Sequence, residues 1–160
     1  MNLTMHFNTV SQRILLTFWV GGLWAVGYVA VPVLFNMIFD RFVAGGIAGR
    51  LFSIMSYIGL VCGTLLLTSV IYQAGREWRR IWQVWVLLAM LLIVAIGEFM
   101  LQPMMQALKA ATPQGFVPGS AEAGRFGLLH GVSSLLYLVT SLLGLVLVVF
   151  GLGKTVRSEE

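Results

Sequence analysis

Four long apolar segments constrain this chain more than any other feature. They cover residues 14–39, 51–72, 81–101 and 126–152, and each has at least 21 residues. A helix needs about 20 residues to cross the hydrocarbon layer of a bilayer, at about 1.5 Å per residue. The segments are continuous rather than alternating, which excludes the strands of a closed barrel. The sequence therefore predicts an all-α integral membrane four-helix bundle, in a single domain over residues 1–160.

The composition excludes the main alternative classes. Apolar residues make up 59% of the chain and charged residues 10%, whereas soluble domains have about 45–50% and about 25%. The net charge is +4, but the basic residues lie between the apolar segments and form no block. We therefore expect the lipid bilayer, and not a nucleic acid, to be the main partner. The single cysteine, Cys62, excludes a disulfide within the chain.

The distribution of arginine predicts the orientation in the membrane. An even number of spans places both termini on one side. Arg76, Arg79 and Arg80 lie within five residues of each other in the short connection between the second and third segments. Because basic residues are enriched in cytoplasmic loops, we expect both termini to be cytoplasmic. The expected outer side then carries two loops, residues 40–50 and 102–125, and residues 103–112 are expected to form an amphipathic helix lying on the membrane.

Polar and small residues with helical spacing predict which faces of the spans point inward, because such residues tend to face the bundle in membrane helices. Three stripes follow this spacing: Thr17, Gly21, Trp24, Tyr28, Pro32 and Phe35 in the first segment; Ser53, Tyr57, Thr64 and Thr68 in the second; His130, Ser133, Tyr137, Ser141 and Gly144 in the fourth. Gly59-xxx-Gly63 and Gly127-xxx-Gly131 favour helix packing as the role of these faces. Pro32 is expected to free a backbone carbonyl in the outer half of the first span.

Two ionisable residues within the segments predict a functional site. Glu98 is the only acidic or basic side chain inside any segment, and His130 is the only histidine there. Even on the mildest scale, a carboxylate at the bilayer centre costs about 2.5–3.5 kcal/mol. Both residues are expected at one depth, about one helical turn below the outer surface. We predict that Glu98 and His130 form a ligand-binding pair, with Arg50 balancing charge and with Tyr57 and Tyr137 contributing to the same site.

The chemistry of this pair leaves several ligands open. A neutral imidazole binds metals and carries protons, and a carboxylate can ligate a metal or orient the imidazole. His130, Glu98 and Met104 form a candidate metal site, since imidazole and thioether ligands suit Cu(I). Haem, with a methionine as second axial ligand, is another alternative. The metal-protease and nucleophile-elbow motifs are missing from the sequence, so we do not expect an enzyme.

Several short motifs resemble a known family. These motifs are Trp24…Gly27…Pro32-Val33-Leu34-Phe35, Ala44-Gly45…Gly49-Arg50-Leu51-Phe52, Glu98…Pro103-Met104-Met105 and Phe126-Gly127…His130-Gly131-Val132-Ser133. They resemble the transmembrane protein 205-like family of four-helix membrane proteins. That resemblance implies a bacterial inner-membrane protein in a family of unknown function, with one eukaryotic relative linked to tolerance of a platinum drug. It also implies a distant similarity to copper-resistance-D-like membrane proteins.

Two functional hypotheses follow from the sequence. The first is a small-ligand, metal-ion or proton site at the outer mouth of the bundle, serving transport or homeostasis. The second is a structural or assembly subunit with no ligand of its own. Under the second hypothesis, the small-residue faces would bind another membrane protein or a second copy of the chain.

Overall fold

The computed structural model describes residues 3–152, with side chains from Thr9 onward, and this part of the chain is helical with no strand. The ends of the expected domain, residues 1–2 and 153–160, lie outside the described residues. The elements in chain order are α1 (Leu3–Trp24), the π-helical η1 (Ala25–Ala30), α2 (Val31–Met37), α3 (Arg41–Ala74), the 3₁₀-helical η2 (Gly75–Arg80), α4 (Trp82–Ile96), the π-helical η3 (Gly97–Leu101), α5 (Gln102–Ala111) and α6 (Ala121–Phe150).

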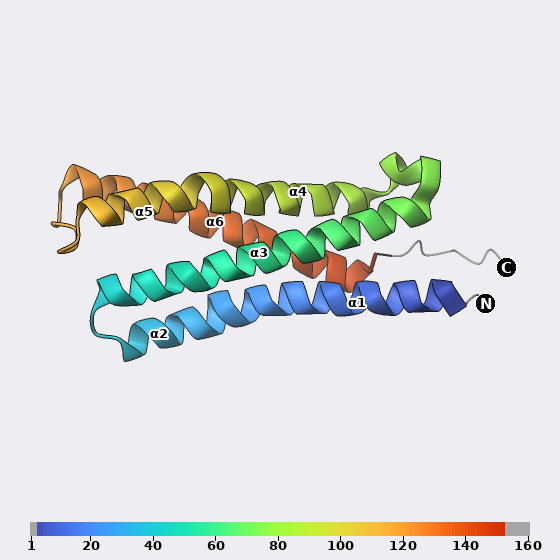
Figure 1. Cartoon of the computed structure of the whole chain (residues 1–160), viewed down its shortest axis with the longest axis horizontal. Coiled ribbons are helices and arrows are strands. Elements are labelled where there is room, and N and C mark those ends of the chain that lie inside the picture. Colours follow the sequence, from blue (N-terminus) through green and yellow to red (C-terminus); the bar gives the residue numbers. More distant parts are fainter. Residues whose placement is uncertain (1–2, 153–160) are drawn as a thin grey trace.

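These elements combine into four rods that are long and apolar enough to cross a membrane: Thr9–Met37, Arg41–Arg80, Trp82–Ala111 and Ala121–Phe150. The predicted all-α bundle of four spans is confirmed, and the chain is a multi-pass membrane protein. Successive rods run in opposite directions (Figure 1), so the described chain begins and ends at the same end of the bundle. We call this the proximal end, and we call the opposite end, which carries the α2–α3 and α5–α6 connections, the distal end.

Helix caps make the distal connections much shorter than expected. The Asp40 carboxylate accepts hydrogen bonds from the backbone N–H groups of Phe42 (2.8 Å) and Val43 (3.1 Å), so α3 begins at once and the predicted loop over residues 40–50 is wrong. The predicted loop over residues 102–125 is also wrong in extent, because α5 fills its first part and Ser120 caps α6. A helix over residues 103–112 is confirmed as α5, but its predicted position on the membrane surface is wrong, because α5 continues the line of α4 within the third rod (Figure 1).

Two prolines explain the two π-helical segments. Each segment ends two residues before a proline: η1 before Pro32 and η3 before Pro103. A proline ring collides with the carbonyl group four residues earlier and offers no N–H to it. Local widening to π geometry accommodates this conflict and satisfies freed backbone groups. Pro32 was predicted to act in this way, and the structure shows the same arrangement on the third rod.

The proximal half of the bundle holds the main apolar core. α1 packs against α3 and α6, and α4 packs against the same two helices. Trp19, Leu66, Leu87 and Leu147 contribute fully buried side chains, one from each rod. Glycine makes this packing possible, because a Cβ atom at Gly59 or Gly63 of α3 would overlap the Trp19 indole. The predicted packing role of Gly59-xxx-Gly63 is therefore confirmed.

The predicted inward stripes are wrong for most residues of the first two spans, although Tyr28 and Phe35 of the first and Ser53 of the second do face the other rods. In the first rod the buried face runs through Leu16, Trp19 and Leu23 of α1, whereas Thr17, Gly21 and Trp24 of α1 and Pro32 of α2 are exposed. In α3 the exposed residues include Tyr57, Thr64 and Thr68. The Thr68 hydroxyl donates to the Thr64 carbonyl oxygen (2.8 Å), so this threonine satisfies its polar group within its own helix and can face lipid. In α6 the prediction succeeds: Tyr137, Ser141 and Gly144 are buried or half-buried, and His130 and Ser133 face a cavity between the rods.

Candidate functional site

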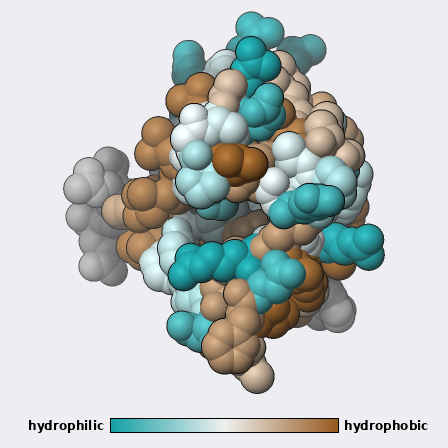
Figure 2. All heavy atoms as spheres, turned by 90° about the vertical axis from the view of Figure 1, so that its left-hand side faces the viewer, coloured by the Kyte–Doolittle hydropathy of each residue, from teal (hydrophilic) through white to brown (hydrophobic). Residues whose placement is uncertain are grey.

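The distal half of the bundle encloses a large cavity of about 1350 Å³. On α6 its wall runs from Phe126 to Thr140, a distance of about 20 Å at 1.5 Å per residue. The wall includes residues from all four rods and from both π-helical segments, among them Tyr28 of η1 and Glu98 of η3. Figure 2 looks onto the distal end and shows hydrophilic side chains gathered around a hollow. The cavity therefore opens at one end of the bundle and penetrates it to about half its length.

The floor of the cavity is apolar and rests on the proximal core. Leu23, Met55, Val94 and Leu136 line it, each from a different rod. Tyr137 closes one side, because its hydroxyl donates to the Leu23 carbonyl oxygen (2.6 Å). A Cβ atom at Gly27 would overlap the Tyr137 ring, so a glycine in η1 is what allows α6 to approach so closely.

Some polar side chains in the wall tie the rods together. The Gln102 amide of α5 donates to the Gly49 carbonyl oxygen (2.9 Å) and to the Ser53 hydroxyl (3.1 Å) of α3. The Lys109 ammonium of α5 donates to the Gly45 carbonyl oxygen (2.9 Å) and lies 5.3 Å from the centroid of the Phe126 ring. These contacts fix α3, α5 and α6 around the mouth, so the polar groups that make them serve the fold.

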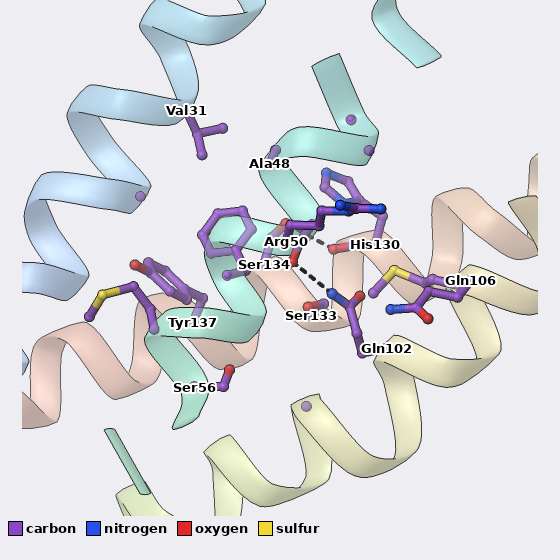
Figure 3. Close-up of a pocket in the computed structure, with 18 of the residues that line it drawn as sticks. Val31, Ala48, Arg50, Ser56, Gln102, Gln106, His130, Ser133, Ser134 and Tyr137 are labelled. Carbon is purple, nitrogen blue, oxygen red and sulfur yellow. Dashed lines mark hydrogen bonds between the residues drawn. The ribbon is translucent and has the colours of Figure 1, made fainter. Parts of the chain in front are cut away.

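A second set of polar side chains lines the cavity without a partner. Arg50, Gln106, His130, Glu98 and Ser133 all line the wall, and within residues 3–152 their side-chain polar groups make no hydrogen bond or ion pair. In Figure 3, Arg50, Gln106 and His130 reach toward the same space from α3, α5 and α6. These groups remain available to water or to a ligand.

The ionised groups around the cavity do not balance. Arg41, Arg50 and Lys109 line it as cations, against the carboxylates of Asp40 and Glu98. The Asp40 carboxylate is already engaged as the cap of α3. The positive charges lie toward the mouth, while Glu98 lies one helical turn nearer the floor than Gln102. The cavity is therefore positive at its entrance and carries one carboxylate deeper in.

The structure brings together most, though not all, of the predicted site residues. Glu98, His130, Arg50 and Tyr137 line the one cavity. Glu98 and His130 form no hydrogen bond or ion pair with each other in the described part of the chain. The ring of His130 instead stacks on Phe126, with 6.0 Å between centroids.

Two predicted residues lie elsewhere. The Tyr57 side chain is 53% exposed and its ring contacts Phe99 on the outer surface, with centroids 6.4 Å apart. Met104 lines a smaller groove of about 530 Å³ between α5 and α6, together with Arg125. The neighbouring Met105, and not Met104, lines the large cavity.

The residues present offer little to a metal ion. No group of three or more His, Cys, Asp or Glu side chains is placed to hold one in the part of the chain that the structure describes. The cavity wall holds two methionines, Met55 and Met105, whose thioethers could add soft ligands for Cu(I) to His130.

Sequence reasoning missed Gln102, Gln106 and Lys109. They lie in a region expected to be an outer loop helix on the membrane, so their shared spacing was not connected with the bundle. The signal was present: these three residues recur at intervals of four and three, which places them on one face of a helix. Continuity of α5 with α4 is what directs that face to the cavity.

Comparison with known proteins identifies a family. The domain of unknown function DUF4149 matches residues 14–114. The chain belongs to the DUF4149 family. The match includes Arg50, Tyr57, Glu98 and Met104 and ends before α6, which supplies His130 and Tyr137. No curated protein and no solved structure matches the chain.

Proposed function

We propose that this DUF4149 protein binds a small ligand in its distal cavity and serves the transport or homeostasis of that ligand. The observation that carries the proposal is the set of unpartnered polar side chains around Arg50, Gln106 and His130. All three side chains are exposed in the chain as described, so their polar groups can exchange cavity water for a ligand, and ionisable groups at membrane depth mark sites of function by default. A cavity that collects such groups from three separate helices is suited to recognition.

The same cavity suits a proton better than a metal ion. Carboxyl and imidazole side chains are common proton carriers in membrane proteins, and neither Glu98 nor His130 is held in an ion pair within the described residues. A metal ion would find only these two ionisable ligands of the classes that bind metals most often, apart from the capping Asp40. A proton that accompanies the ligand is therefore the ionic role that these residues support best.

Cysteine accessibility tests whether the cavity is open to solutes. In a Cys62→Ala background, Ser133→Cys places a thiol in the cavity wall, and Ser141→Cys places one at a fully buried position that does not line the cavity. We expect a charged, membrane-impermeant thiol reagent to modify Ser133→Cys rapidly and to leave Ser141→Cys unmodified. Ser56→Cys, from α3, gives an independent second probe of the same wall. Equal protection of all three thiols would contradict the proposal.

We also propose that the distal end faces outward from a bacterial inner membrane, with both termini in the cytoplasm. Arg76, Arg79 and Arg80 support this orientation because they cluster at the proximal end, in η2. The same impermeant reagent tests it in intact cells: a thiol at the cavity mouth should react, and a thiol in η2 should not. The reverse pattern would invert the topology.

A structural or assembly role is the second candidate. One observation favours it: a Cβ atom at Gly124, Gly127 or Gly131 of α6 would meet nothing within 4 Å. These glycines therefore do not pack within the chain, unlike Gly59 and Gly63, and small residues on a membrane helix allow another helix to approach. Gly127→Leu should then break an assembly seen in mild detergent while leaving the isolated chain folded. If the assembly state does not change, this face has no such role.

A further inference from the structure

Building on the proposed binding function, we propose that the ligand is an amphiphile with an anionic headgroup, a phosphate or a carboxylate. The headgroup would lie beside Arg50 and His130, near the mouth. The apolar part would extend toward Val94 and Leu136 at the floor. Three features of the cavity support this assignment: its charge, the depth of that charge, and its size.

Unengaged cationic side chains favour an anion. Arg50 lines the cavity with its guanidinium free of any ion pair within residues 3–152. Guanidinium groups bind phosphate and carboxylate oxygens through paired, charge-assisted hydrogen bonds. His130 adds an imidazole N–H donor, and the charge of Lys109 lies at the same mouth. A cationic ligand would meet an excess of positive charge on entry.

The carboxylate of Glu98 limits how deep the anion can go. Glu98 lies nearer the floor than Gln102. The side-chain amide of Gln102 donates to the Gly49 carbonyl oxygen, which places Gln102 level with Gly49 and with the adjacent Arg50. A negative headgroup below Arg50 would meet like charge in a medium that screens poorly. The headgroup therefore stays at the mouth, and only an uncharged part of the ligand passes Glu98. This opposition of charges predicts opposite effects of neutralising the two residues.

The shape of the cavity accounts for an apolar tail. Its volume of about 1350 Å³ exceeds the roughly 300–1,000 Å³ of common small-molecule sites. The lower wall is mainly apolar, with Ser56 and Thr140 also in it. The hydroxyls of Tyr137 and Thr140 are already bonded to the carbonyl oxygens of Leu23 and Leu136. An inorganic anion would use only the mouth, whereas a chain of about ten to twelve carbons would also cover the floor.

Photolabelling of the full chain in phosphatidylcholine nanodiscs tests the proposal. The probe is dodecyl phosphate with a diazirine near its methyl end, and peptide mass spectrometry locates the adduct. We expect adducts on α4 and α6 around Val94 and Leu136. Unlabelled dodecyl phosphate or dodecanoate should compete, and inorganic phosphate should not. Competition by inorganic phosphate as strong as that by dodecyl phosphate would overturn the amphiphile and leave a simple anion site.

Two substitutions with opposite expected effects on labelling test the charge of the headgroup. Arg50→Gln should weaken specific labelling about tenfold, the loss expected when one charge-assisted contact is removed. Glu98→Gln should strengthen it by about two- to fivefold, because a repulsion is removed. Arg125→Gln is the matched control, since Arg125 is at the same end of the bundle but lines the smaller groove, and it should change nothing. Weaker labelling in both Arg50→Gln and Glu98→Gln would overturn the anionic headgroup.

Further probes separate this inference from the proposed function. A diazirine analogue of dodecylamine carries a positive charge, and a diazirine analogue of dodecanol carries no charge. If either labels the floor as well as the phosphate does, the anionic assignment fails while ligand binding stands. Ser133→Trp and Ser56→Trp, from different helices, should each fill the cavity and abolish labelling by any probe that binds there. If no probe gives labelling that is lost in both of these folded variants, the proposed function fails as well.

Discussion

The two halves of the bundle are built from the same four rods but differ in what fills them. In the proximal half, large side chains such as Trp19, Leu87 and Leu147 meet at the centre and are completely buried. In the distal half, the centre is a cavity lined by charged and polar groups. None of the residues of η1, α2 or η3 is buried. The packed half therefore supplies stability, and it leaves the other half free to keep a space open.

The two halves also differ in where their polar side chains form hydrogen bonds. Ser141 and Thr140, at the boundary between the halves, are fully or nearly fully buried and donate to carbonyl oxygens of their own helix. Arg50 and His130 have no such bond in the described chain. Functional sites commonly give up local stability in this way and depend on a rigid scaffold nearby. Four substitutions test this comparison.

The largest effect is expected from Trp19→Ala. The side chain is 0% exposed and sits against Gly59 and Gly63, so its removal leaves a cavity in the only well-packed half. We expect the free energy of unfolding to fall by about 3–5 kcal/mol. Trp24→Ala, one and a half turns toward the distal half and 41% exposed, is the control. Equal losses of unfolding free energy in lipid bicelles would erase the contrast between the halves.

Gly59→Val should have the next largest effect. Its side chain would overlap the Trp19 indole, and overpacking of a core costs about 1–3 kcal/mol. Gly127→Val is the matched control, since a Cβ atom there meets nothing within 4 Å, and it should change stability by less than about 0.5 kcal/mol. The two variants are compared by heating each one and then measuring, by size-exclusion chromatography, the fraction of monomer that remains. A loss at Gly127 instead would mean that this face packs against another chain.

Tyr137→Phe should have a smaller effect at the boundary of the halves. It removes the hydroxyl that donates to the Leu23 carbonyl oxygen (2.6 Å). Hydrogen bonds between membrane helices contribute about 0.6 kcal/mol on average and at most about 1.7 kcal/mol. Tyr57→Phe, on the outer surface at 53% exposure, should be neutral in the same unfolding measurement. A neutral result at Tyr137 would show that ring packing against Gly27, and not the hydroxyl, joins α6 to η1.

Arg50→Gln should have the smallest effect on stability. The residue is exposed toward the cavity and has no partner within residues 3–152, so the free energy of unfolding should stay within about 0.5 kcal/mol of the original. Gln102→Leu should cost about 1 kcal/mol, because it removes two hydrogen bonds between α5 and α3. If Arg50→Gln destabilised the protein more than Gln102→Leu, Arg50 would be a structural residue and not a free binding group.

Much of the fold was predictable because the bilayer restricts it so strongly. A continuous apolar segment longer than 20 residues has one stable solution in lipid, a helix that satisfies its own backbone. The four spans and the packing of Gly59 and Gly63 follow from such local rules, and so does a disturbed backbone at Pro32, although its π-helical form was seen only in the structure. The sequence could also predict that Glu98, His130, Arg50 and Tyr137 line one cavity, because each is a polar residue in the same half of its span.

The inward faces of the first two spans were not predictable in the same way. In water, an apolar stripe must turn inward; in lipid, apolar surface gains nothing by turning inward, and hydroxyls can bond to their own helix. Thr64 and Thr68 show this, because they are polar and yet face outward. Which face packs is decided by shape, here by the fit of Trp19 against two glycines, and shape is a property of two helices together.

The sequence by itself therefore determined that the chain spans a membrane four times, and it singled out Glu98 and His130 as residues that lipid alone would not tolerate. Only the tertiary structure decided that the two line one cavity with no hydrogen bond or ion pair between them in the described chain, that α5 extends its polar face into that cavity, and that Tyr57 and Met104 lie outside it. The physical reason is that the cost of a charge in lipid can be read from one residue. The space between four helices depends on how their side chains fit against one another.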